Sequence, residues 1–267
     1  MAGPERKTPE DMALMREAGR LLASVFRWLD GRVQVGMTTL AINDLVEAHI
    51  RQVLQARPAS QGQYGFPYVL NTSINEVVCH GVPSDTQCLQ VGDIVNVDIT
   101  LEKNGFIADS SKMYLVGEVK AEARRLVEVT YAAMWAGIRQ VRPGARLGDV
   151  GHAIQQHAQQ HGYSVVREYC GHGIGRQMHE APQVLHYGTP GRGQMLVPGM
   201  TFTIEPMINQ GKAAVRQLRD GWTVVTADRQ LSAQWEHTVA VTDDGVEILT
   251  LREEERLPRV LVQTVPG

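Results

Sequence analysis

Residues 93–116, which read DIVNVDITLEKNGFIADSSKMYLV, decide the fold that we expect. Two strand-like runs, Asp93–Leu101 and Phe106–Val116, flank the pair Asn104-Gly105. An Asn-Gly pair between such runs is the strongest short-range signal for a β-hairpin with a two-residue turn, because both central positions need a positive φ. The segment therefore predicts two long antiparallel strands.

The predicted turn places two aspartates on one face of the hairpin. With Asn104 and Gly105 at the centre of the turn, Asp109 lies opposite Thr100, which shares a face with Asp98 because side chains alternate along a strand. The two aspartates are then diagonal neighbours, roughly 7–8 Å apart at the backbone and closer at their tips. Such a pair could hold metal ions, although either acid alone is better explained by an arginine or backbone partner. A three-residue turn would shift this register.

Outward from the hairpin, apolar residues at helical spacing predict four helices. They are expected from Thr8 to at least Val25, from Thr38 or Thr39 to Leu54, from about Ala121 to Gln140, and from after Gly144 to near Gly162. The first has a threonine N-cap, a proline and two acids at its start, which is a typical helix beginning.

The second half of the chain contains further strand patterns. They cover Met200–Ile208, Trp222–Thr226, Gln234–Thr242 and Val246–Leu251. Gly92 and Asp98 match Gly199 and Glu205 in spacing, with an apolar-rich strand between glycine and acid in both cases. A duplicated half-domain would bring the two acids to a shared centre. Since no Pro- or Ser-rich linker divides residues 1–267, we expect a single domain with a loosely held tail from Leu257 to Gly267.

Composition excludes several classes of protein. The chain has 267 residues, 43% of them hydrophobic, and a formal net charge of −3, which is ordinary for a globular protein and gives no basic footprint for DNA. No apolar run approaches the roughly 20 residues that cross a bilayer, and the polar start lacks the core of a signal peptide. The three cysteines, Cys79, Cys88 and Cys170, form no Cys-x-x-Cys pair, so a cytoplasmic location is expected.

Three further residues complete a candidate metal site. Glu205 and Glu236 interrupt strand-like runs, and His172 lies in a glycine-rich segment, Gly171–Gly175. A lone glutamate in such a run more often lies on an exposed strand face. Together with Asp98 and Asp109, these residues form an oxygen-rich donor set that suits a pair of Co, Mn, Fe or Zn ions. Two ions about 3.5–4 Å apart would activate a water molecule, which points to hydrolysis.

Seven motifs in this order resemble the type I methionine aminopeptidases over about Thr8–Leu251. The motifs are Ser73–Pro83, Asp93–Asp98, Asp109-Ser110, Gly171–Gly175, Met178–Pro182, Phe202–Pro206 and Gln234–Thr238. The resemblance implies an α+β pita-bread fold, in which a pseudo-twofold antiparallel β-sheet is backed by helices. It also implies removal of the initiator methionine from nascent polypeptides whose second residue is small.

The resemblance assigns roles to the candidate site residues. Asp98, Asp109 and Glu236 would hold one ion, and Asp109, His172, Glu205 and Glu236 the other. Glu205 would also move a proton. His179 would bind the carbonyl oxygen of the substrate and His80 its peptide nitrogen. Without the resemblance, His80 is a histidine in a loop and His179 a partner of a ligand.

The same resemblance points to a pocket for the methionine side chain, lined by Tyr64, Phe66, Met178 and Trp222. Two residues depart from the usual pattern, because Asn71 stands where cysteine is usual and Met178 where phenylalanine is usual. Methionine can pack against a thioether, so methionine binding is still expected, with weaker turnover than in typical members.

The resemblance further implies a monomer, with a monovalent cation as an optional further cofactor. The loop Gln210–Asp220 carries three basic residues that would suit transient contact with the ribosome, although a solvated loop is the better explanation for them.

Four other assignments compete with this one. Relatives that cleave before proline or act on creatine carry an additional N-terminal domain, and type II methionine aminopeptidases carry an insertion for which the step from Glu205 to Glu236 is too short. An aminopeptidase of the same fold with altered first-residue specificity stays open, as does a non-catalytic binding protein.

Overall fold

The predicted hairpin is present as β4 (Ile94–Lys103) and β5 (Phe106–Leu115) in the computed structural model, which describes residues 4–262. Asp98 is paired with Ser111 and Thr100 with Asp109, which is the predicted register. Both turn residues have positive φ, 53° for Asn104 and 80° for Gly105, as a two-residue hairpin turn requires. The prediction that both aspartates share a face is therefore confirmed.

All four predicted helices form. They are α1 (Pro9–Leu29), α2 (Thr39–Ala48), α3 (Ala121–Ile138) and α4 (Leu147–Gln160). The Thr8 hydroxyl accepts a hydrogen bond from the Asp11 amide, and the Asp11 carboxylate accepts one from the Thr8 amide, so both groups cap the start of α1. A π-helical turn, His49–Val53, continues α2 toward the predicted end at Leu54.

The strands form four antiparallel sheets. One contains β4, β5, β1 (Arg57–Pro58) and β2 (Leu70–Ile74). The largest has the order β16 (Val260–Val262), β15 (Gly245–Ile248), β14 (His237–Val241), β9 (Thr201–Ile204), β7 (Gly171–Gly173) and β8 (Glu180–Val184). Two smaller sheets join β13 (Ser232–Gln234), β10 (Met207–Asn209) and β6 (Ser164–Val165), and β11 (Val215–Gln217), β12 (Val224–Thr226) and β3 (Val77–Cys79).

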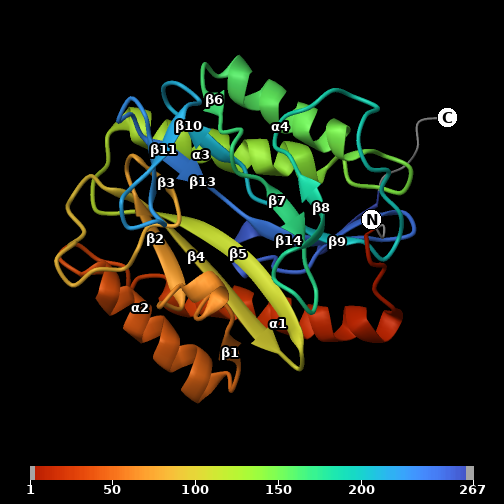
Figure 1. Cartoon of the computed structure of the whole chain (residues 1–267), viewed down its shortest axis with the longest axis horizontal. Coiled ribbons are helices and arrows are strands. Elements are labelled where there is room, and N and C mark those ends of the chain that lie inside the picture. Colours follow the sequence, from red (N-terminus) through yellow and green to blue (C-terminus); the bar gives the residue numbers. More distant parts are fainter. Residues whose placement is uncertain (1–3, 263–267) are drawn as a thin grey trace.

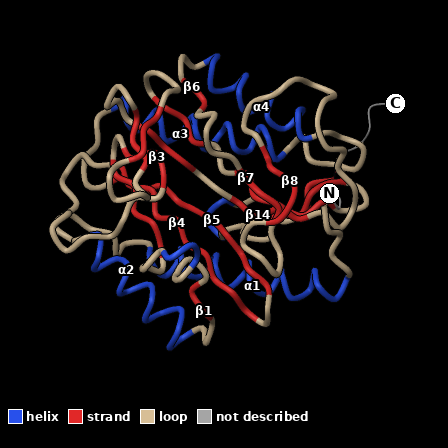
Figure 2. Tube along the Cα trace, in the orientation of Figure 1, coloured by secondary structure: helices blue, strands red, loops and turns tan. Residues whose placement is uncertain are grey.

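Helices cover the strands from two sides (Figures 1 and 2). In the view of Figure 1, α1 and α2 lie below the strands, and α3 and α4 lie above them. The lower pair packs on β2 and β4 through residues such as Phe26 and Val97, while the upper pair packs on β9, β14 and β15 around Ile154 and Phe202. Each half of the molecule thus has its own strands and its own helix pair, as the predicted α+β pita-bread fold requires.

Two strands that were predicted to be continuous are each interrupted. In place of Met200–Ile208 the chain forms β9 and β10, and in place of Gln234–Thr242 it forms β13 and β14. Ile204 pairs with His237 on one side of the gap, and Met207 pairs with Gln234 on the other, in a different sheet. Pro206 has no amide hydrogen to donate, so it cannot continue the ladder.

The tail differs from the prediction. β16 pairs with β15, so the segment Val260–Val262 is held by a strand ladder that the short apolar sequence did not reveal. The remainder of the predicted loose tail, residues 263–267, lies outside the described residues. The strand predicted at Val246–Leu251 runs from Gly245 to Ile248, and the one at Trp222–Thr226 is shortened to Val224–Thr226. Among residues 4–262, no helix is both long and apolar enough to span a membrane.

Replacing the turn glycine should destabilise the hairpin. At φ 80°, a Gly105→Ala variant forces a Cβ into the left-handed region, and we expect a loss of about 1–2 kcal/mol in the free energy of unfolding. Urea denaturation measures this. Asn104→Gly is the matched control, because glycine adopts positive φ without strain. An unchanged free energy in the alanine variant would contradict the assigned turn.

Candidate metal centre

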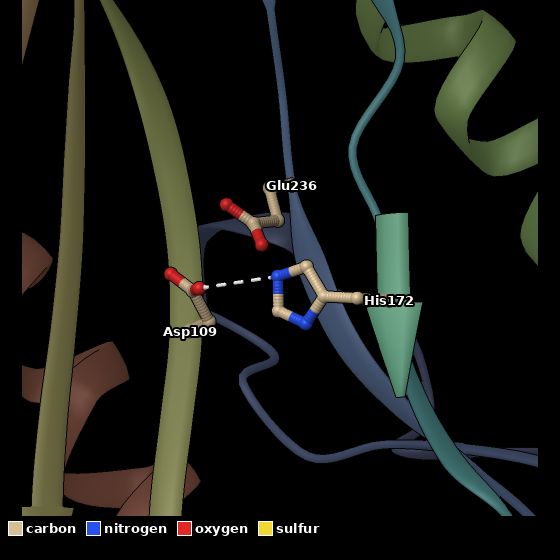
Figure 3. A group of neighbouring side chains, drawn as sticks. All are labelled: Asp109, His172 and Glu236. Atoms are coloured by element: carbon tan, nitrogen blue, oxygen red, sulfur yellow. Dashed lines mark ion pairs between the residues drawn. The ribbon is translucent and has the colours of Figure 1, made fainter. Parts of the chain in front are cut away.

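Asp109, His172 and Glu236 form the tightest group of candidate ligands (Figure 3). One ligand atom from each lies within 4.8 Å of the other two. Asp109 comes from β5, His172 from β7, and Glu236 from the gap between β13 and β14. Three segments that are distant in sequence therefore converge on one point.

The imidazole of His172 is oriented for ligation. Its Nδ1 lies 3.0 Å from the Gly173 carbonyl oxygen, to which it donates, so Nε2 keeps a free lone pair. Nε2 lies 3.7 Å from Asp109 Oδ2 and 3.5 Å from Glu205 Oε1. Burial lowers the pKa of His172 to about 3, so the ring is neutral at physiological pH and able to bind a cation.

Glu205 is held by a set of polar partners. The Thr203 hydroxyl donates to Oε1 at 2.7 Å, and the Gln234 amide donates to Oε2 at 3.3 Å. The backbone amide of Glu205 donates to His186 Nε2 at 3.1 Å. Neither Thr203 nor Gln234 was predicted from the sequence to hold a ligand in place. Each stands two residues before a glutamate, so period-two alternation was the available signal.

Glu205 and Glu236 lie in the same gap between sheets. Both fall between the pairs Ile204–His237 and Met207–Gln234, where the two chain segments change sheets together. Next to Glu236, Trp235 points toward α3, where its Nε1 donates to the Val127 carbonyl at 3.1 Å. Glu236 points the other way, into the cavity. The interruption that the sequence analysis missed is thus what turns both glutamates inward.

All five predicted ligands line one cavity of about 510 Å³. Asp98 lies outside the tightest group, but its carboxyl and that of Asp109 are close enough to shift each other's pKa. In the metal-free protein, burial raises the pKa of Asp98 to about 7 and that of Glu205 to about 8. Burial, with repulsion from neighbouring carboxylates, raises the pKa of Asp109 and Glu236 well above the usual range.

The residues fit a divalent metal centre. Asp109 Oδ1 and Glu236 Oε1 are buried and have no hydrogen-bond partner within residues 4–262. A buried carboxylate oxygen without a donor requires a cation or a proton. Four carboxylates and one neutral imidazole supply the hard oxygen and nitrogen donors that such ions prefer.

The two predicted catalytic histidines border the same cavity. His179 Nδ1 lies 3.1 Å from the Tyr64 hydroxyl, and the ring centroids of His172 and His179 are 4.3 Å apart. His80 packs edge-on against Tyr169 and has a φ of 55°, a strained value for a residue other than glycine. Burial lowers the pKa of His179, and it lowers that of His80 to about 4, so both rings are neutral at physiological pH.

The predicted side-chain pocket lies in this cavity as well. Its lining includes Tyr64, Phe66, Met178, Trp222 and Asn71. Phe66 contacts Trp222 with ring centroids 5.0 Å apart, whereas Tyr64 is 73% exposed and stands at the mouth.

Comparisons with known proteins agree with this geometry. Residues 13–243 match the family model described as metallopeptidase family M24. The chain is 49% identical over 255 residues to a methionine aminopeptidase of Escherichia coli K12, covering 96% of this chain and 97% of that protein. It is 51% identical over 241 residues to methionine aminopeptidase B of Synechocystis, covering 89% and 88% respectively.

Solved structures show the same likeness. The crystal structure of methionine aminopeptidase from Rickettsia prowazekii superposes with a TM-score of 0.91 at 49% identity, over 93% of this chain and all of that one. A prolidase from Pyrococcus furiosus shares the fold at 20% identity, with a TM-score of 0.75 over 93% of this chain and 66% of that one. The chain therefore belongs to metallopeptidase family M24, in which it groups with the methionine aminopeptidases.

Proposed function

We propose that this protein removes the N-terminal methionine from nascent polypeptides by metal-dependent hydrolysis, with a preference for a small second residue. The observation that carries the proposal is that Asp109, His172 and Glu236 each place one ligand atom within 4.8 Å of the other two. Among the described residues, the carboxylates of Asp109 and Glu236 each have one oxygen without a hydrogen-bond partner, and both residues line the cavity. The likeness to methionine aminopeptidases over nearly the whole chain supplies the substrate class.

The proposed centre holds two divalent ions of the Co, Mn, Fe or Zn type. Asp98, Asp109 and Glu236 would bind one ion, and Asp109, His172, Glu205 and Glu236 the other. Ions bound there would supply Lewis-acid polarisation of the scissile carbonyl and a water molecule of lowered pKa. A monovalent cation as a further cofactor stays a prediction.

Glu205 is the proposed proton carrier. Its hydrogen bonds from Thr203 and Gln234 fix the carboxyl in the cavity. A carboxyl group held at one place beside the reacting atoms can both accept and return a proton. Glu205 would take a proton from the attacking water and pass it to the nitrogen of the leaving peptide.

His179 and His80 are the proposed substrate-orienting groups. When the Tyr64 hydroxyl donates to Nδ1 of His179, the ring must carry its proton on Nε2. That N–H can donate to the oxygen on which negative charge develops during hydrolysis. His80, neutral and held against Tyr169, would bind the nitrogen of the scissile peptide bond.

The methionine side chain would occupy the part of the cavity lined by Tyr64, Phe66, Met178 and Trp222. The Phe66–Trp222 contact provides an aromatic wall, and Met178 offers a polarizable thioether surface. Asn71 introduces an amide into this wall, which supports weaker turnover than a fully apolar pocket would give.

We further propose a cytoplasmic, monomeric, single-domain enzyme. One domain is supported by hydrogen bonds that join the two halves, such as that from the Thr238 hydroxyl to the Asp109 carbonyl at 2.7 Å. Ribosome contact would use Lys212, Arg216 and Arg219, which are all exposed in or beside β11.

A glutamine at position 205 should abolish turnover. Because glutamine cannot carry a proton, Glu205→Gln is expected to lower kcat by about 10²- to 10⁴-fold on a Met-Ala peptide with Mn or Co. Release of methionine, measured by chromatography, tests this. Glu118→Gln, at an exposed position away from the cavity, should match the unaltered protein.

The same assay separates the competing functions. Release of other first residues in preference to methionine would indicate an aminopeptidase of altered specificity. No release with any of the four metals would support a non-catalytic protein and contradict the proposal, and full activity of Glu205→Gln would contradict the role of that residue.

Metal binding should release protons and strengthen with pH. Asp98 and Glu205, with pKa values of about 7 and about 8, are partly protonated in the neutral metal-free protein and must lose protons to bind a cation. Affinity for Mn is therefore expected to rise between about pH 6 and pH 8.5. Calorimetric titration in buffers of different ionisation enthalpy measures the released protons, and Glu205→Gln should release fewer. An enthalpy independent of buffer would contradict this prediction.

A further inference from the structure

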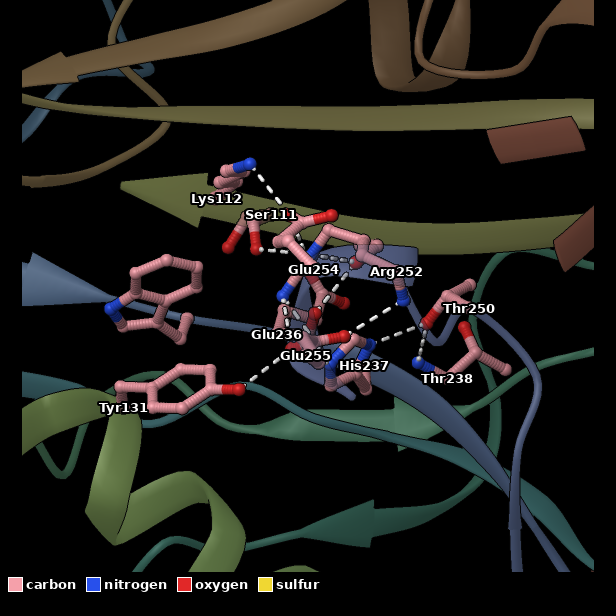
Figure 4. A network of polar contacts seen from close by, with 12 residues as sticks. Ser111, Lys112, Tyr131, Glu236, His237, Thr238, Thr250, Arg252, Glu254 and Glu255 are labelled. Carbon is pink, nitrogen blue, oxygen red and sulfur yellow. Dashed lines mark hydrogen bonds and ion pairs between the residues drawn. The ribbon is translucent and has the colours of Figure 1, made fainter. Parts of the chain in front are cut away.

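A buried arginine, Arg252, belongs to a network of polar contacts that also contains the candidate ligand Glu236 (Figure 4). Arg252 follows β15, and its side chain is fully buried. Nη2 donates to Glu255 Oε1 at 3.2 Å, and the same carboxylate oxygen lies 2.9 Å from His237 Nε2. A buried guanidinium without such a partner would be strongly destabilising. The rings of Phe26 and Trp235 are each 5.4 Å from its central carbon.

The other edge of the guanidinium reaches the residues that carry the candidate ligands. Nη1 donates to the Ser110 hydroxyl at 3.1 Å and to the Ser111 carbonyl at 3.3 Å. Ser110 follows Asp109 in the chain, and its hydroxyl donates in turn to the Glu236 carbonyl at 2.6 Å. One guanidinium therefore connects to both candidate bridging ligands, Asp109 and Glu236, through the Ser110 side chain.

These contacts cross the boundary between the sheet that contains β5 and the sheet that contains β14, which we call the seam. β5 and β14 belong to different sheets, so their separation is not set by a regular ladder. Individual bonds join them instead, including that from the Glu236 amide to the Ser111 carbonyl at 3.3 Å and that from the Thr238 hydroxyl to the Asp109 carbonyl. The Ser111 carbonyl accepts from both Arg252 and Glu236. The hydrogen bonds of Arg252 thus help to set the distance between Asp109 and Glu236.

A purely structural role would use only half of these contacts. Pairing with Glu255 would be sufficient to fix the turn Glu253–Glu255 after β15. The contacts to Ser110 and Ser111 add nothing to that turn, but they hold the strand that carries Asp109 against the segment that carries Glu236. Groups that orient metal ligands from behind typically change metal affinity when they are replaced.

We propose that Arg252 is a positioning residue of the metal centre, which holds Ser110 and Ser111 so that Asp109 and Glu236 are spaced to bind cations together. This inference rests on the metal centre proposed above. Arg252 touches neither substrate nor ion, and its effect passes through Ser110.

The test is calorimetric titration of the metal-stripped full-length protein with MnCl2. Arg252→Lys keeps the charge but loses the planar fork that contacts Ser110, Ser111 and Glu255 together. We expect its Kd for Mn to be about 10- to 100-fold weaker. Arg259→Lys is the matched control, because Arg259 donates to the Leu249 carbonyl at 3.0 Å in the same C-terminal segment and, within residues 4–262, makes no hydrogen bond to β5 or to Glu236. Its Kd should be unchanged.

Ser110→Ala keeps the proposal testable if Arg252→Lys does not fold. It removes the hydroxyl between Arg252 and Glu236, and it should weaken Mn binding in the same direction. Where Arg252→Lys does fold, the combined loss in the double variant should be smaller than the product of the two single losses, because both act through one connection. Losses that multiply independently would overturn the route through Ser110.

Two results separate this inference from the proposed function. Variants that fold and bind Mn with the Kd of the unaltered protein would overturn the role of Arg252 while leaving the metal centre intact. An unaltered protein that takes up no Mn, Co, Fe or Zn would overturn the metal centre itself, and with it the role of Arg252.

Discussion

The crowding of four carboxyl groups in one buried cavity is the constraint on which the rest of the structure depends. Burial raises the pKa of Asp98, Asp109, Glu205 and Glu236 in the metal-free protein, and repulsion from neighbouring carboxylates raises it further at Asp109, Glu205 and Glu236. Such a group is tolerated only where protons or cations neutralise it. The surrounding fold must therefore hold the acids together against their own repulsion, and it does so with rigid elements on every side.

Three local features of the structure hold the ligands in place. The β4–β5 hairpin fixes Asp98 and Asp109 through an uninterrupted ladder. The paired change of sheet at Glu205 and Glu236 turns both glutamates toward the cavity. The Gly173 carbonyl fixes the tautomer of His172, so that its free nitrogen faces the acids. Each feature needs only local geometry, but the cavity exists only where the two halves meet, which is why the proposed chemistry belongs to the whole domain.

The features that the sequence predicted well are those with local or motif-level causes. The register at Asp98 and Asp109 follows from one Asn-Gly turn, and the start of α1 follows from Thr8 and Pro9. The interruptions at Glu205 and Glu236 were missed because each half of an interrupted strand still has strand-like composition, and the change of sheet depends on distant partners. Arg252 was missed for a similar reason, since its contacts with Ser110 and Ser111 join segments that nothing in the local sequence connects.

A crystal structure of the Mn-saturated protein, with anomalous scattering recorded at the Mn edge, tests the central claim most directly. The account predicts two Mn peaks about 3.5–4 Å apart in the cavity, with Asp109 and Glu236 contacting both and His172 contacting one. A single peak at saturation, or peaks outside the cavity formed by Asp98, Asp109, His172, Glu205 and Glu236, would contradict it.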